Sequence, residues 1–109
     1  MLSLSQARCC YNQINQSSLS SLRAAVFRQA IDYAHLRCQW QLLDRQQRQE
    51  IDERRTIAHN AFIDSINILS RNMAGQGEDI SWRATLGNDR KVIGDFACYI
   101  ALFLALQAR

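Results

Sequence analysis

The sequence contains almost none of the residues that interrupt a helix. It has no proline and only four glycines, and three of these glycines lie between positions 74 and 88. Glycine and proline are the main residues of turns, so a chain of 109 residues with so few of them favours long helices. We therefore predict an all-α fold, a bundle of three long helices, with room for a short fourth helix at the N-terminus between Ser3 and Ile14.

Length and composition predict a single helical domain over residues 1–109. Hydrophobic residues make up 48% of the chain and charged residues 21%, which is the balance of an ordinary globular protein rather than of a disordered one. A chain of this size can bury one hydrophobic core but not two. Within the domain we expect residues 1–17 to form a short N-terminal segment and residues 74–88 to form the main loop.

The spacing of apolar residues and the presence of capping residues predict where the helices begin and end. From Leu22 to Leu43 apolar residues recur at alternating steps of four and three, which predicts the first long helix. Asp44, followed three residues later by Gln47, resembles a capping box and predicts a turn before a second helix. The alternative is one uninterrupted helix that runs to Met73. The other caps are predicted to be Ser18 or Ser20 for the first long helix, Gly75 for the end of the second, and Asn88 or Asp89 for the last.

Cysteine usage, charge and hydropathy limit the compartment and the partners. The four cysteines show no CxxC spacing, which favours free thiols in a reducing cytoplasm. The net charge of +3 comes from mixed acidic and basic residues, so nucleic-acid binding is not indicated. The apolar run from Phe96 to Leu106 is too short to cross a membrane, which takes about twenty residues. Only two histidines are present and no zinc-type spacing occurs, so we expect no metal and no cofactor.

A short polar series interrupts an otherwise apolar side of the second long helix. Asp52, Arg55 and His59 follow one another at spacings of three and four, which places them on one side of a helix. That side continues into Ile63 and Ile66, so the three polar residues border the core. We interpret them as a seam of ion pairs and hydrogen bonds where two helices or two subunits meet.

The same segment contains an arginine and, five residues later, a histidine, Arg54 and His59. This spacing resembles the motif of HEPN-type ribonucleases. The resemblance implies metal-independent RNA cleavage at a dimer interface, with the histidine acting as base or acid and the arginine stabilising the phosphorane. The sequence departs from the pattern at Arg55, where that family has a small polar residue.

A second polar strip and one acidic residue are candidate pocket residues. Polar residues at steps of four, three and four form the strip, which is either a solvated face or, together with a tryptophan from the main loop, the wall of a ligand pocket. An acidic residue in the last helix either needs a cation, with Arg71, Arg83 and Arg90 as candidates, or is favoured by the helix dipole. The residues of this candidate pocket are Asn60, Asp64, Asn67, Arg71, Trp82 and Asp95.

The segment RRTIAHNAFIDSINILSRN, together with the later IGDFA, is similar to a family of small helical bacterial proteins of unknown function. That resemblance implies a helical fold and a bacterial or mobile-element origin, and no activity. Because two of the expected helices are apolar on more than one side, we predict a homodimer and a non-enzymatic interaction or regulatory role in the cytoplasm. The alternatives are a HEPN-like ribonuclease and a small-ligand-binding helical domain.

Overall fold

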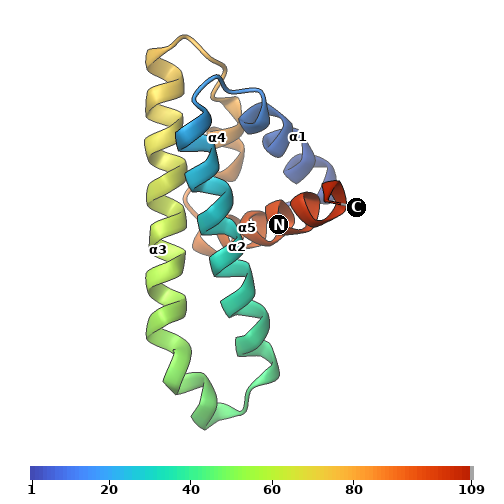
Figure 1. Ribbon diagram of the computed structural model, residues 1–109, viewed down its shortest axis with the longest axis vertical. Helices are drawn as coiled ribbons and strands as arrows, with labels where there is room; N and C mark the ends of the chain where they lie inside the picture. Colours follow the sequence, from blue (N-terminus) through green and yellow to red (C-terminus); the bar gives the residue numbers. More distant parts are fainter. Residues whose placement is uncertain (109) are drawn as a thin grey trace.

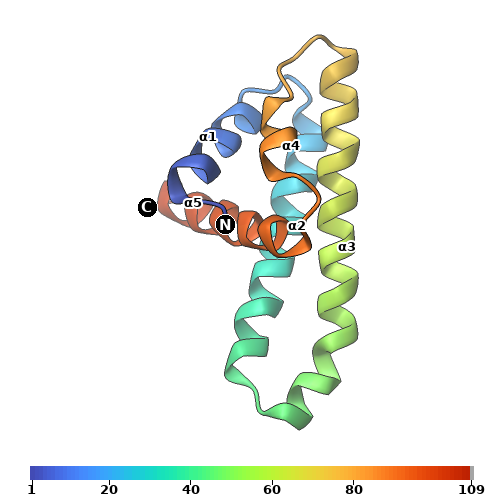
Figure 2. The ribbon, with the colours of Figure 1, turned by 180° about the vertical axis from the view of Figure 1, so that it is seen from behind.

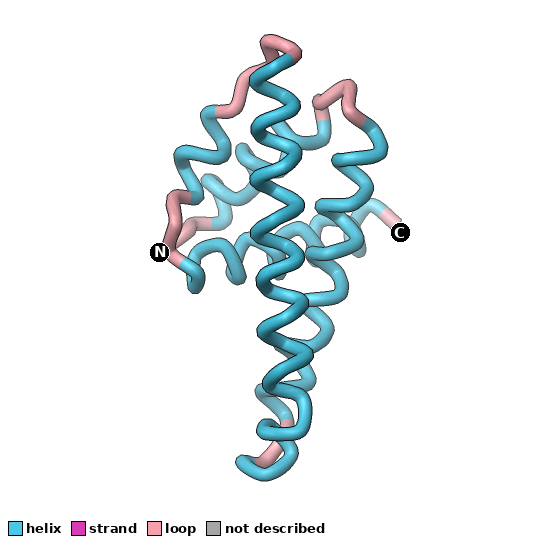
Figure 3. Tube along the Cα trace, turned by 90° about the vertical axis from the view of Figure 1, so that its left-hand side faces the viewer, coloured by secondary structure: helices cyan, strands magenta, loops and turns pink. Residues whose placement is uncertain are grey.

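The computed structural model describes residues 1–108 and confirms an all-α fold, without a strand in that part of the chain (Figures 1 and 2). The connections between helices are short, as Figure 3 shows. The five helices are α1 (Leu4–Asn15), α2 (Ser20–Leu42), α3 (Arg45–Gly75), α4 (Ser81–Leu86) and α5 (Arg90–Gln107).

The two longest helices, α2 and α3, form an antiparallel hairpin that sets the long dimension of the molecule, 47 Å (Figure 1). The turn between them lies where the capping box predicts it. The Asp44 side chain accepts a hydrogen bond from the backbone of Gln47 (2.9 Å), and the Gln47 side chain accepts one from the backbone of Asp44 (3.1 Å). Arg48, in the first turn of α3, also stabilises the connection to α2. Its guanidinium donates to the carbonyl of Trp40 (2.9 Å) and stacks on the indole of the same residue. The alternative of one uninterrupted helix is therefore excluded.

The third long helix, α5, crosses the hairpin instead of running alongside it (Figures 1 and 2). Its main contacts are with α2, and α1 and α4 pack at the same end of the molecule. All five helices contribute to the core, which is centred on aromatic pairs such as Phe62 and Phe96, whose ring centroids lie 6.3 Å apart. The largest fully buried side chains include Tyr11, Ile14, Val26, Phe62, Ile66, Leu69, Trp82, Leu86, Phe96 and Ile100.

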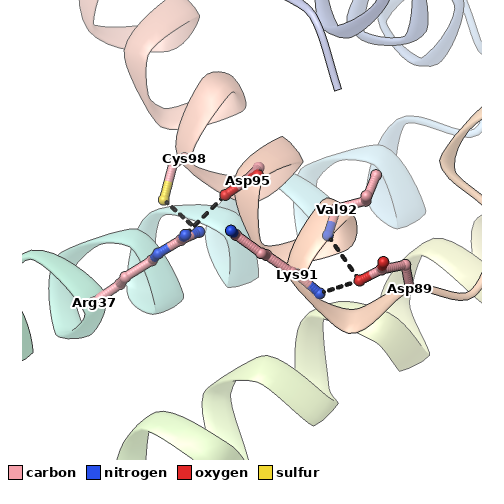
Figure 4. Close-up of polar contacts among 6 residues, drawn as sticks. All are labelled: Arg37, Asp89, Lys91, Val92, Asp95 and Cys98. Carbon is pink, nitrogen blue, oxygen red and sulfur yellow. Dashed lines mark hydrogen bonds and ion pairs between the residues drawn. The ribbon is translucent and has the colours of Figure 1, made fainter. Parts of the chain in front are cut away.

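Helix ends agree with the sequence signals at some positions and differ at others. The predicted short N-terminal helix is present as α1, capped by Ser3, and Asp89 caps α5 by accepting from the backbone of Lys91 at 2.8 Å (Figure 4). The predicted serine cap of α2 is wrong, because its N-cap is Leu19, which makes no side-chain hydrogen bond. Instead, the Glu78 carboxylate accepts a hydrogen bond from the backbone N–H of the residue before Leu19 at 3.0 Å.

Two corrections concern the segment predicted as the main loop. Gly75 is the last residue of α3 rather than its cap, which is Gln76. At the end of α3 it is Gly77 that has a positive φ, 76°, and a second glycine of the segment, Gly87, has a φ of 64°. This segment also contains α4, because burial of Trp82 and Leu86 in the core stabilises a helix too short to persist alone.

The close approach of α5 to α2 depends on Gly94. A Cβ atom at this position would lie 2.9 Å from the hydroxyl oxygen of Tyr33 and 3.3 Å from a guanidinium nitrogen of Arg37. Contacts this short require the neighbours to move, and Tyr33 is buried and cannot move freely. Glycine therefore permits the two helices to cross with their surfaces in direct contact.

We expect Gly94→Val to lower the free energy of unfolding by about 2 kcal/mol, because the larger side chain overpacks this crossing. The matched control is Gly75→Val, at a helical position where a Cβ has nothing within 4 Å; there valine should leave stability unchanged or slightly raised. Urea unfolding followed by circular dichroism measures both. Equal effects of the two substitutions would contradict the role of Gly94.

Candidate functional site

A basic hollow of about 320 Å³ lies where α5 crosses the helical hairpin. Three helices supply its walls: α2, α3 and the first turn of α5. We use the name basic hollow for the space lined by Tyr33, Arg37, Arg55, Thr56, His59, Arg90 and Lys91.

Arg37, which lines the hollow, forms a close ion pair with Asp95, which lies just outside that lining. The guanidinium of Arg37 donates to the Asp95 carboxylate at 2.7 Å and approaches the sulfur of Cys98 at 3.7 Å (Figure 4). Both charged side chains are about three-quarters buried, with relative exposures of 21% and 24%. The cation for Asp95 is therefore Arg37, and none of the three arginines expected from the sequence. The helix-dipole interpretation is also wrong, because α5 begins at Arg90 and Asp95 lies beyond its first turn.

Arg55 and Asp52 form part of the predicted polar seam. Their ion pair measures 3.3 Å, and the Arg55 guanidinium lies over the indole of Trp40 at 4.5 Å from the ring centroid. The Asp52 side chain is 56% exposed, so water screens this pair and it contributes less than about 1 kcal/mol. The Nε atom of Arg55 is buried and has no hydrogen-bond partner within residues 1–108.

His59, the third predicted member of the seam, makes its contacts elsewhere. Its imidazole stacks on the ring of Tyr33, with centroids 4.7 Å apart, and its Nδ1 atom lies 3.3 Å from a guanidinium nitrogen of Arg90. Because an arginine can only donate, Nδ1 is the acceptor and the proton of the neutral ring lies on Nε2. That Nε2 atom is buried and lacks a hydrogen-bond partner in the described part of the chain.

The surroundings of His59 favour its neutral form. Burial lowers the pKa of His59, and the positive charges of Arg90, Arg55 and Arg37 lower it further. The seam is thus a real cluster, but it is organised around arginines from three helices rather than around an Asp–Arg–His ladder on one helix.

The structure does not bring the residues of the predicted ligand pocket together. Asn60 accepts a hydrogen bond from Arg90 (2.9 Å) at the edge of the basic hollow, and Asp64 is exposed. Asn67 and Arg71 border a separate, wide depression, while Trp82 is only 1% exposed and belongs to the core. The sixth residue, Asp95, pairs with an arginine of α2, as described above.

The two residues of the ribonuclease resemblance lie on different faces of the hairpin. His59 lines the basic hollow, whereas Arg54 lines a groove between α2 and α3 on the other side. We call this space, of about 440 Å³, the outer groove. Within one chain Arg54 and His59 are therefore not neighbours in a common site. The outer groove is lined by Gln29, Ile31, Asp32, His35, Leu36, Arg54, Ile57, Ala58 and Ala61.

The outer groove exposes large apolar side chains to water. Ile31 and Ile57 have relative exposures of 47% and 59%. Each of them stands two residues before a residue of the basic hollow, Tyr33 or His59, and two helical positions differ by about 200°. The two isoleucines thus lie on the face of the hairpin opposite to α5.

Sequence patterns alone did not find Tyr33, Arg37, Arg90 and Lys91 as neighbours of His59. One signal was available: Arg37 follows Tyr33 at a spacing of four, on a side of α2 that is otherwise apolar. A charge at such a position indicates a polar partner on the helix that packs there. Which helix provides it depends on the tertiary fold.

No known family model matches the sequence, and neither a curated protein nor a solved structure matches the chain. The two family resemblances noted from the sequence therefore stay predictions. No helix within residues 1–108 is long and apolar enough to cross a membrane. In the same residues, no three His, Cys, Asp or Glu side chains are grouped so that they could hold a metal ion.

The lowered pKa of His59 predicts a pH dependence of stability. The unfolded chain takes up a proton at a histidine near pH 6.5, whereas folded His59 resists protonation. Its contribution is therefore complete above about pH 6.5 and is lost as the pH falls through the lower pKa of the folded state. We expect the free energy of unfolding to decrease between pH 7.5 and pH 5.5, and His59→Gln to flatten that decrease. The matched control is His35→Gln on the exposed outer groove; if it flattens the profile as much, the assignment to His59 is wrong.

Proposed function

We propose that the protein is a non-enzymatic helical module that acts through protein–protein contacts, and that a second copy of the chain covers its outer groove. The observation that carries this proposal is the exposure of Ile31 and Ile57 on neighbouring helices of one face. Leu36 and Ala61 extend the apolar surface between them. An apolar surface of this kind is typical of a site of association.

The size of the apolar surface sets the strength of the contact. Burying a fully exposed isoleucine contributes about 1.5–3 kcal/mol, so each of these half-exposed side chains contributes roughly 1 kcal/mol. A twofold dimer buries four of these isoleucine side chains, two from each copy. Their combined contribution offsets only the low end of the association cost of about 4–15 kcal/mol. The four isoleucines therefore do not hold a dimer together by themselves. A reversible dimer with a dissociation constant in the micromolar range corresponds to about −8 kcal/mol, so we expect polar contacts across the groove to supply the remainder.

Charges at the groove favour a second copy of the same chain as the occupant. Asp32 on α2 and Arg54 on α3 flank the isoleucines, and neither forms an ion pair within the described residues. In a twofold contact the same patch meets itself, so α2 of one copy can lie over α3 of the other. Asp32 would then face Arg54 of the second copy, and each ion pair would occur twice.

The cysteines support a reducing compartment, and we propose the bacterial cytoplasm. All four thiols are free, and two of them, Cys9 and Cys38, are exposed. Burial, with a smaller effect of the neighbouring Cys9, raises the pKa of Cys10 to about 11, so that thiol stays protonated and inert near neutral pH. Such thiols suit a compartment in which disulfides are kept reduced.

Light scattering in reducing buffer tests self-association. We expect a concentration-dependent mass that approaches twice that of the chain near 100 μM for the unsubstituted protein. Ile57→Lys should give the monomer, because burying a lysine of the groove lining without a partner is costly. The matched control is Leu106→Lys in α5, where the leucine has a similar exposure of 46%; it should leave the dimer intact. A monomer at every concentration, or equal effects of both substitutions, would refute the proposal.

Charge exchange tests the proposed orientation of the two copies. Asp32→Arg and Arg54→Asp should each raise the dissociation constant about fivefold, since like charges then meet across the twofold axis. The double variant should recover most of the loss. If the double variant is weaker than either single variant, the two residues do not face each other.

A further inference from the structure

The basic hollow has more positive charge than the chain itself neutralises. Four cationic side chains line it, and two carboxylates pair with two of them, Asp95 with Arg37 and Asp52 with Arg55. The other two cations are Arg90, whose hydrogen bonds go to the neutral groups of Asn60 and His59, and Lys91, which has no ion-pair partner within residues 1–108. Two positive charges therefore remain without a counter-charge at one crossing of three helices.

Hydrogen-bond donors are also in excess at this crossing. The chain leaves two buried polar atoms unpartnered here, Nε of Arg55 and Nε2 of His59. Both are donors, the second because Arg90 occupies the acceptor nitrogen of the ring. The guanidinium groups, the Lys91 ammonium and the Thr56 hydroxyl add further donors around the space. Within residues 1–108 the chain thus offers no acceptor to either of the two buried donors.

We infer that the basic hollow binds the phosphate group of a small phosphate monoester. A guanidinium matches the geometry of phosphate oxygens, and the cations here come from three helices, so they can contact oxygens that point in different directions. Near pH 7.5 a phosphate monoester is largely a dianion, which equals the two uncompensated charges of the hollow. The volume of about 320 Å³ lies in the range of small-molecule pockets.

A small molecule fits these observations better than a nucleic acid. The positive charge is concentrated in one hollow, while the remainder of the chain mixes acidic and basic residues to a net charge of +3. Binding to a nucleic-acid backbone requires cations spread along several phosphates. The inference is independent of the proposed self-association, because the hollow and the outer groove lie on opposite faces of the hairpin.

Isothermal titration calorimetry at pH 7.5 and 150 mM NaCl tests the inference with four probes. Inorganic phosphate and adenosine 5′-monophosphate distinguish a free phosphate from a phosphate ester, adenosine tests whether the phosphate is needed, and a uridine decamer tests a nucleic-acid backbone. We expect adenosine 5′-monophosphate to bind, inorganic phosphate to bind or compete at the same site, and adenosine not to bind. Binding of the decamer alone, or of none of the phosphates at millimolar concentration, would overturn the inference.

Substitutions of residues that line the hollow test whether the phosphate binds there. Arg90→Gln and Lys91→Gln should each raise the dissociation constant for adenosine 5′-monophosphate by about tenfold, because each removes a charge-assisted hydrogen bond. The matched control is Arg71→Gln, on the exposed face of α3 outside the hollow, which removes the same charge and should change affinity by less than about twofold. If Arg71→Gln weakened the binding of adenosine 5′-monophosphate equally, the ligand would be held by the overall positive charge of the protein, and the assignment of the site to the hollow would be overturned. Circular dichroism checks that every variant is folded.

The Ile57→Lys variant tests whether phosphate binding in the hollow is independent of the proposed self-association. Its substitution lies in the outer groove, so a folded monomer should bind adenosine 5′-monophosphate as tightly as the unsubstituted protein. Loss of binding in that variant would show that the hollow needs a second copy, and would overturn the site as a property of one chain.

Discussion

The contact between Gly94 and the side chains of Tyr33 and Arg37 determines how the third long helix meets the hairpin. With hydrogen in place of a side chain, the surface of α5 lies directly on α2. That distance allows Arg37 to reach Asp95, one residue further along α5. It also brings the first turn of α5, with Arg90, next to His59 on α3. The basic hollow is therefore a consequence of this crossing and not of any one helix.

The burial of charge at the crossing is tolerated because the two cations that are largely buried, Arg37 and Arg55, both have partners. A largely buried guanidinium without a partner would be costly, but Arg37 has the Asp95 carboxylate and Arg55 has the face of the Trp40 indole as well as Asp52. His59 avoids the cost by remaining neutral, because burial and the surrounding arginines lower its pKa. The cluster thus persists with two uncompensated charges, both at the beginning of α5.

Local features of the fold could be predicted from the sequence, whereas its long-range contacts could not. The capping box at Asp44 and the cap at Asp89 involve residues two or three positions apart, so short sequence patterns contain the information. The pair of Arg37 and Asp95 joins residues 58 positions apart, and the sequence shows only that each needs a partner. Trp82 illustrates the same limit, because a tryptophan in a polar segment suggests a pocket wall, while packing of α1 and α4 places it in the core.

The hairpin therefore has a basic face and an apolar face, and residues only two positions apart on the same helix belong to different faces. Residues two apart point in nearly opposite directions, so Tyr33 and His59 face α5 while Ile31 and Ile57 face water. A ligand that neutralises the cations would stabilise the crossing by its binding free energy, since it binds the folded arrangement and not the unfolded chain. An effect on the outer groove would require that binding change the spacing of α2 and α3, because only differential affinity for two arrangements transmits coupling.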